Sequence, residues 1–177
     1  MEIKTKETIV AETKKSNQRA VEWFAAIPAD LFFKREGEVW SASDNVDHLI
    51  KAIKPIALAL KMPRLGLQTM FGKAEHPSRT YVEICKIYED EIAKGGQASG
   101  RFLPDQQSPA EPEIQKKELL DQLSKTGNSL LSALEQWQDA ELDQYQLPHP
   151  ILGKLTIREM LFFSIYHTLR HARIEGD

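Results

Sequence analysis

Two of the five histidines, His167 and His171, stand four residues apart in the stretch YHTLRHARIE. In an α-helix this spacing puts both side chains on one face, so that a ring nitrogen of each can reach the same cation. The spacing also occurs by chance on amphipathic helices, where a buried histidine usually needs only a hydrogen-bond partner. The pair therefore indicates either a metal site or a polar position in a helical core.

A metal site needs a third ligand, and His48 in SASDNVDHLIKA is the other histidine on a predicted helix. At about 100° per residue, His48 falls at the edge of that helix's apolar stripe, beside Ala52 and Ala59. These small neighbours leave room for an imidazole to turn inward. His76 and His149 each precede a proline, so we expect them in turns, either exposed to solvent or forming the turn itself.

Four segments of helical periodicity must position these histidines. Apolar residues recur at three- and four-residue spacing over residues 6–26, 41–61, 113–139 and 156–174. Ser41 or Ser43 is the expected cap of the second segment, and TIRE predicts a capping box at the fourth, with Thr156 as cap and Glu159 reaching back. No segment has a convincing strand pattern.

The fourth segment can be phased by its inward-facing positions. Alternating steps of three and four residues select Ile157, Met160, Ser164, His167, His171 and Ile174. Both histidines of the pair therefore belong to the face that the other helices should bury.

A long connection, residues 63–112, separates the second and third segments. Its stretch SRTYVEICKIYEDEIAKGG predicts a further helix, capped by Ser78 and ended by Gly95 and Gly96, whereas residues 97–113 indicate a loop across one end of the fold. The sequence therefore predicts an all-α fold. We expect one domain over residues 1–177, an antiparallel four-helix bundle with one additional helix in the connection after the second helix.

Composition excludes several classes of protein. The 177 residues carry a formal charge of -3 without a basic stripe, so we expect no nucleic-acid partner. No apolar run reaches the roughly 18 residues of a membrane span, and the N-terminus has no apolar signal core. Cys85 is the single cysteine, which rules out an internal disulfide and predicts a cytoplasmic protein. We expect Cys85 to be a half-buried helix residue.

Two longer blocks of the sequence resemble the DinB-like superfamily, which includes metal-dependent bacillithiol transferases. They are VWSASDNVDHLIKA and HPILGKLTIREMLFFSIYHTLRHARIE, in which an HP-x-x-G turn leads into a helix ending in HxxxH. The resemblance implies a four- or five-helix bundle with three histidines on a divalent metal, commonly zinc or nickel. Carried over to this chain, the metal ligands are His48, His167 and His171.

Three neutral imidazoles would leave a divalent ion with an open position, as in catalytic sites. The leading hypothesis is nucleophilic transfer or hydrolysis by a metal-activated thiol or water, with a small-molecule substrate and a low-molecular-weight thiol as the possible cosubstrate. Asp44, one turn before His48, is the candidate catalytic residue, to orient that ring or accept a proton, although it could simply favour the helix N-terminus. Thr13 and Asn17 are polar residues on the inward-facing side of the first helix, so they could reach a cavity at the metal site, or they could fix the register of the helices.

The alternative hypothesis is a noncatalytic metal- or ligand-binding module that forms a homodimer. It rests on a second set of apolar residues in the fourth segment, which a second subunit could cover: Leu161, Phe162, Phe163, Ile165 and Leu169.

Overall fold

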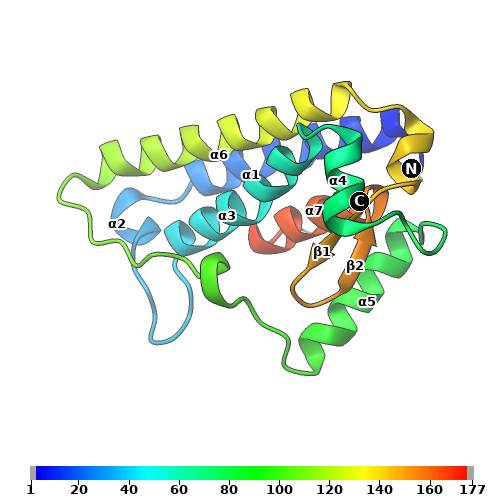
Figure 1. The fold of residues 1–177 in the computed structure, drawn as a ribbon. Coiled ribbons are helices and arrows are strands. Elements are labelled where there is room, and N and C mark those ends of the chain that lie inside the picture. The colour runs from blue at the N-terminus through cyan, green and yellow to red at the C-terminus, as the bar shows by residue number, and fades with distance from the viewer. Residues whose placement is uncertain (1–2, 175–177) are drawn as a thin grey trace.

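The computed structural model describes residues 3–174, which are mainly helical, in agreement with the predicted all-α class (Figure 1). The longer helices are α1 (Lys6–Ala25), α3 (Ala42–Leu60), α5 (Tyr81–Ala93), α6 (Pro112–Glu135) and α7 (Ile157–His171). Shorter helices are α2 (Ala29–Phe32), α4 (Arg64–Phe71), η1 (Gly100–Phe102) and η2 (Asp139–Asp143). Two strands, β1 (Gln146–His149) and β2 (Gly153–Thr156), form a small sheet.

The helices α1, α3, α6 and α7 enclose the core, each packing against two of the others (Figure 1). Two neighbouring pairs are antiparallel. In the first, Lys6 at the start of α1 donates to the carbonyl of Glu135 at the end of α6. In the second, His171 at the end of α7 meets Asn45 at the start of α3.

The other two neighbouring pairs are parallel, which differs from the expected antiparallel arrangement. The indole of Trp137, just after α6, donates to the carbonyl of Leu60 at the end of α3, at 2.9 Å. Arg158 at the start of α7 donates to the carbonyl of Lys4, just before α1. The long connection after α3 causes this difference, because it returns the chain to the end at which α3 began (Figure 1).

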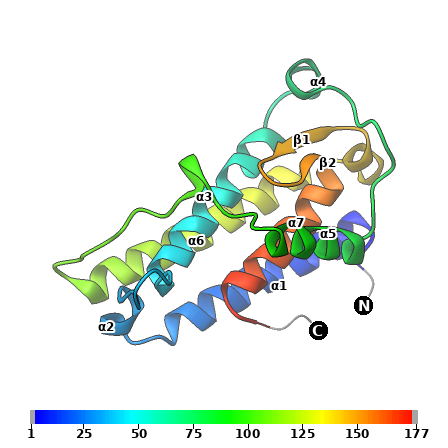
Figure 2. The ribbon, with the colours of Figure 1, turned by 90° about the horizontal axis from the view of Figure 1, so that it is seen from below.

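The additional helix in the long connection, α5, lies across α7 (Figure 2). Aromatic contacts join the two helices, with the Tyr88 ring centroid 5.1 Å from that of Phe163. The cap of α5 is Thr80, whose hydroxyl accepts from the backbone of Glu83, and not Ser78 as predicted. The Ser78 hydroxyl instead bonds Asp143 and Thr156, which tie it to the start of α7.

The expectation that the chain contains no strand was wrong. Strands β1 and β2 pair antiparallel, with Gln146 opposite Thr156 and His149 opposite Gly153. The sequence concealed this hairpin because each strand has only four residues and Pro148 stands within the first. Gly153 has a φ of 74°, a left-handed conformation that glycine adopts without strain.

Asn17 and Thr13 do not line the cavity that lies beside His48, His167 and His171. Asn17 faces α6 at Gly127, where an added Cβ atom would lie 2.4 Å from the Asn17 amide nitrogen. Gly127 therefore permits the close approach of α1 and α6.

The second apolar face of α7 is buried within the chain itself. Leu161, Phe162, Phe163 and Ile165 are each at most 5% exposed. The chain's own elements therefore cover the apolar face on which the homodimer prediction rested. The homodimer remains a prediction, and this face no longer supports it. No helix in residues 3–174 has the length and apolar character needed to cross a membrane.

Candidate metal centre

Three histidines from two helices converge inside the fold. The candidate ligand nitrogens of His48 on α3 and of His167 and His171 on α7 all lie within 4.8 Å of one another. The two Nε2 atoms of His48 and His167 are 3.1 Å apart. His48 and His167 are about 95% buried and His171 is half-buried. The antiparallel contact of α3 with α7 produces this meeting, since it sets the start of one helix against the end of the other.

Two of the rings are held by hydrogen bonds on the side away from the cluster. His48 Nδ1 lies 2.7 Å from the carbonyl oxygen of Phe102, which can only accept, so Nδ1 carries the proton. His171 Nδ1 lies 2.7 Å from Asn45 Oδ1. The Asn45 amide donates to the Ser41 carbonyl at 2.7 Å, which fixes its orientation and makes its oxygen the acceptor.

These hydrogen bonds leave the Nε2 lone pairs of His48 and His171 free to face the cluster. A partner on the far ring nitrogen is the usual way in which proteins fix the tautomer of a metal-binding histidine. The Phe102 carbonyl belongs to the connection after α5, which is itself fixed to α3. Lys51 donates to the Leu103 carbonyl, and the Asp105 backbone donates to Asp47.

Electrostatics keep the three imidazoles uncharged. Burial, followed by the proximity of His171, His48 and His149, holds the pKa of His167 well below its usual range. Burial also lowers the pKa of His48, and it lowers the pKa of His171 to about 3 together with the proximity of His48 and Arg170. All three rings are therefore neutral at pH 7, the state in which imidazole is a metal ligand.

The donor set fits a divalent transition-metal ion. Neutral imidazoles suit zinc and nickel, and three of them leave at least one coordination position open. Two buried ring nitrogens at 3.1 Å can share one proton in a hydrogen bond, but a third lone pair pointing at them remains unsatisfied. A cation at the centre of the three rings would satisfy all of these nitrogens.

Asp44 occupies the N3 position of α3 and does not orient His48. Its carboxylate accepts from Arg35 at 2.6 and 2.8 Å and from the hydroxyl and backbone of the cap Ser41, each at 2.8 Å. Burial works to raise the pKa of Asp44, but these hydrogen bonds outweigh it and lower the pKa. The carbonyl of Phe102, and not Asp44, orients the His48 ring. Ser41, one of the two predicted candidates, is the cap of α3.

A cavity of about 280 Å³ opens beside the three histidines. Ala52 and Ala59 line it, so the small residues flanking His48 do provide the room predicted for that ring. Residues 97–99 and 101–102 form part of the wall, which gives the first part of the predicted loop a place in the site. Tyr88 on α5 also lines the cavity, a position that no pattern in the sequence indicated.

His149 was expected in a turn, either exposed or shaping the turn. It shapes the turn, because its Nδ1 accepts from the backbone of Ile151 and Leu152 at 3.2 and 3.1 Å. It is also half-buried and lines the cavity, with its ring centroid 4.2 Å from that of Phe163. Burial lowers the pKa of His149 to about 4, so it faces the cavity as a neutral ring.

His76 and Cys85 lie away from the cavity. His76 is exposed, as predicted. Cys85 is half-buried on α5, also as predicted, and burial raises the pKa of its thiol to about 11. This thiol stays protonated at pH 7 and is a weak nucleophile.

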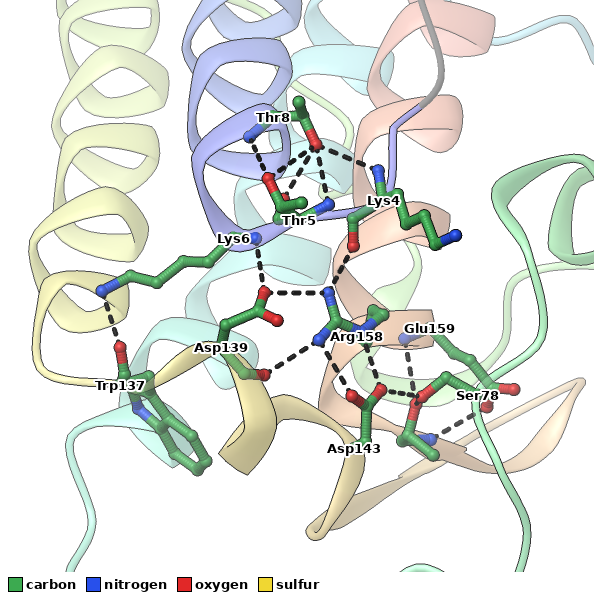
Figure 3. A network of polar contacts seen from close by, with 11 residues as sticks. Lys4, Thr5, Lys6, Thr8, Ser78, Trp137, Asp139, Asp143, Arg158 and Glu159 are labelled. Atoms are coloured by element: carbon green, nitrogen blue, oxygen red, sulfur yellow. Dashed lines mark hydrogen bonds and ion pairs between the residues drawn. The ribbon is translucent and has the colours of Figure 1, made fainter.

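A polar network fixes the start of α7, the helix that carries two of the three histidines (Figure 3). Arg158 donates to the Asp143 carboxylate at 2.7 and 2.9 Å and also to Asp139. Glu159, fully buried, closes the predicted capping box with Thr156. Glu159 also accepts from Arg79, in the segment before α5. These contacts join α7 to η2 and to that segment, and therefore set the position of the helix along its axis.

A mainly helical fold with three converging imidazoles beside a cavity defines a candidate metal-binding helical protein. The family model described as the DinB superfamily matches residues 12–174. The chain therefore belongs to the DinB superfamily. Comparison with curated proteins and with solved structures gives no match.

Proposed function

We propose that this protein is an enzyme that binds a divalent metal ion, zinc or nickel, through His48, His167 and His171. Its reaction would be nucleophilic transfer or hydrolysis on a small substrate in the adjoining cavity. The observation that carries the proposal is the convergence of three neutral imidazole nitrogens, all within 4.8 Å, at the wall of a cavity of about 280 Å³. Members of the superfamily are often metal-dependent.

A bound divalent ion would supply a Lewis acid that lowers the pKa of a water or thiol at its open position. The chain's own residues hold the rings of His48 and His171 in one tautomer and provide a largely apolar pocket for the substrate. No Asp or Glu among the described residues lines the cavity, so the lining offers no carboxylate as a general base.

The nucleophilic thiol, if a thiol is used, must come from solution. Cys85 is the chain's only cysteine, it does not line the cavity, and burial raises its pKa to about 11. We therefore propose a low-molecular-weight thiol as the cosubstrate, with water as the simpler acceptor of the transferred group. In thiol transfer to an aryl chloride, the new S–C bond replaces the C–Cl bond, and chloride and the thiol proton are released.

The test compares metal-loaded and metal-stripped protein without a histidine tag. Each is incubated with 1-chloro-2,4-dinitrobenzene and a panel of low-molecular-weight thiols, and separately with a p-nitrophenyl ester in water. We expect metal-dependent consumption of a thiol or of the ester, restored when the metal is returned. If neither substrate reacts faster with the loaded protein, the noncatalytic binding module is the better account.

Asn45→Ala is expected to weaken metal binding by about 10- to 100-fold, because it removes the acceptor that orients the His171 ring. Competition with a chromophoric chelator measures this affinity. Asn45→Asp is the matched control, since its carboxylate retains an oxygen acceptor for His171 Nδ1. Equal affinities of Asn45→Ala and wild type would show that His171 does not depend on this contact.

A further inference from the structure

The charged residues that line the cavity beside the three histidines are both arginines, Arg101 and Arg170. Among the described residues the lining contains no aspartate, glutamate or lysine. The neutral histidines add no compensating negative charge, and a bound divalent ion would add two positive charges. The charged side chains that line the pocket are therefore all positive, although the protein as a whole carries a net charge of -3.

The two arginines line the cavity from different elements. Arg101 lies in η1, with its guanidinium 5.0 Å from the ring centroid of Phe102, the residue whose carbonyl holds His48. Arg170 lies near the end of α7, next to His171, with its guanidinium 6.0 Å from the ring centroid of Tyr88. Both charges thus lie over aromatic residues of the cavity wall, and Arg170 is close enough to His167 and His171 to lower their pKa values.

Neither Arg101 nor Arg170 forms an ion pair with a carboxylate within residues 3–174. Other arginines of the chain hold carboxylates at 2.6 to 3.1 Å, namely Arg35, Arg64, Arg79 and Arg158. Arginine is suited to bind a carboxylate or phosphate through two parallel hydrogen bonds. The Arg170 side chain hydrogen-bonds the Tyr166 hydroxyl. A guanidinium carries five N–H donors, so both arginines keep donors for an anion that enters the cavity.

Gln97 and Ser99 also line the cavity, and most of the remaining wall is apolar. Ala52, Ile56 and Ala59 come from α3, Met160 and Phe163 from α7, and Phe71 from α4. A ligand that was only an anion would gain nothing from these apolar walls, and a purely apolar ligand would gain nothing from the two guanidiniums.

We propose that the substrate of this site is a small amphipathic anion, with its acidic group bound by Arg101 and Arg170 and its apolar body in the cavity. This inference rests on the proposed function and names the chemical class of its substrate. The arginines act as binding residues that orient the molecule, which brings its reactive part toward His48, His167 and His171. A guanidinium on each of two different elements also makes the site selective for one orientation.

Isothermal titration calorimetry with 4-phenylbutyrate and its neutral amide, 4-phenylbutyramide, tests this proposal. The two probes share an apolar body and differ in charge. Wild type should bind the carboxylate at least about tenfold more tightly than the amide. Arg101→Gln and Arg170→Gln should each weaken carboxylate binding by about fivefold and leave amide binding and metal content unchanged.

Arg173→Gln is the matched control. Arg173 follows α7 closely and lines a separate cavity, so its replacement should leave the binding of both probes as in wild type. Circular dichroism of every variant checks that the fold is retained.

Three outcomes would overturn the proposal. The first is equal affinity for the carboxylate and the amide, and the second is no carboxylate binding at millimolar concentration. The third is a carboxylate preference that survives the double substitution but disappears when the metal is removed, which would assign the carboxylate to the ion. A protein that binds no metal yet shows the arginine-dependent preference would contradict the proposed function while supporting the anion site.

Discussion

His167→Ala is expected to lower the affinity for Zn²⁺ by about a thousandfold, because it removes one of three ligands from a site whose binding energy is shared among few bonds. His167 is the most enclosed of the three rings, and both other histidines contact it. Its ring centroid lies 4.9 Å from that of His48 and 4.4 Å from that of His171. Elemental mass spectrometry of the purified protein and competition with a chromophoric chelator measure the loss.

His76→Ala is the control for this experiment, since it removes an exposed histidine far from the cluster in sequence and leaves the three rings intact. It should retain the metal affinity of wild type. Unchanged occupancy in His167→Ala would show that the ligand assignment is wrong. Unchanged affinity in His48→Ala would remove α3 from the site and leave only the pair on α7.

Arg79→Met is expected to lower the free energy of unfolding by about 3 kcal/mol at pH 7, because it leaves a buried carboxylate without its counter-charge. Glu159 is fully buried and accepts from the Arg79 guanidinium at 2.7 and 3.1 Å. The methionine side chain preserves much of the packing volume, and the backbone N–H of residue 79 can still donate. Urea denaturation of both proteins measures the difference.

The effect of Arg79→Met should depend on pH. Burial works to raise the pKa of Glu159, but hydrogen bonds from Arg79 and Thr156 outweigh it and hold the pKa below its usual range. A carboxyl group whose pKa is lowered by folding stabilises the protein above its unfolded pKa, and this contribution is lost as the pH falls through the folded pKa. The gap between wild type and Arg79→Met should therefore narrow below about pH 4.5.

Lys86→Met provides the comparison for a solvent-exposed ion pair. Lys86 lies 3.1 Å from Asp90 on the surface of α5, with both side chains more than half exposed. Lys86→Met should lower the free energy of unfolding by less than about 0.5 kcal/mol, because water screens exposed ion pairs. If Arg79→Met and Lys86→Met lower the free energy of unfolding by similar amounts, then Arg79 does not stabilise the buried carboxylate of Glu159.

Local patterns predicted much of α7 correctly. TIRE identified its capping box, and the alternating three- and four-residue steps placed Met160, Ser164 and His167 among the buried residues. The same reasoning placed His48 at the edge of an apolar stripe, where small neighbours do open onto a cavity. These predictions succeed because a cap or a helical face depends on residues at most four positions apart.

Several features of the site had no local signal. The carbonyl of Phe102 reaches His48 across 54 positions of sequence. Arg101 and Arg170 look like ordinary surface residues in the sequence, and they share a cavity only in the folded chain. The alternative that Asp44 favours the helix N-terminus is confirmed by its capping box with Ser41. Its ion pair with Arg35 had no local signal, because Arg35 lies in the segment before the helix.

The sequence alone determined that the protein is mainly helical and that His167 and His171 share the buried face of one helix, because hydrophobic periodicity and capping act within a few residues. Only the tertiary structure decided which helices are parallel neighbours, that His48 meets the pair on α7, and which residues form the walls of the cavity. Those contacts join positions more than fifty residues apart. They depend on how all the apolar faces are buried together, which no single segment specifies.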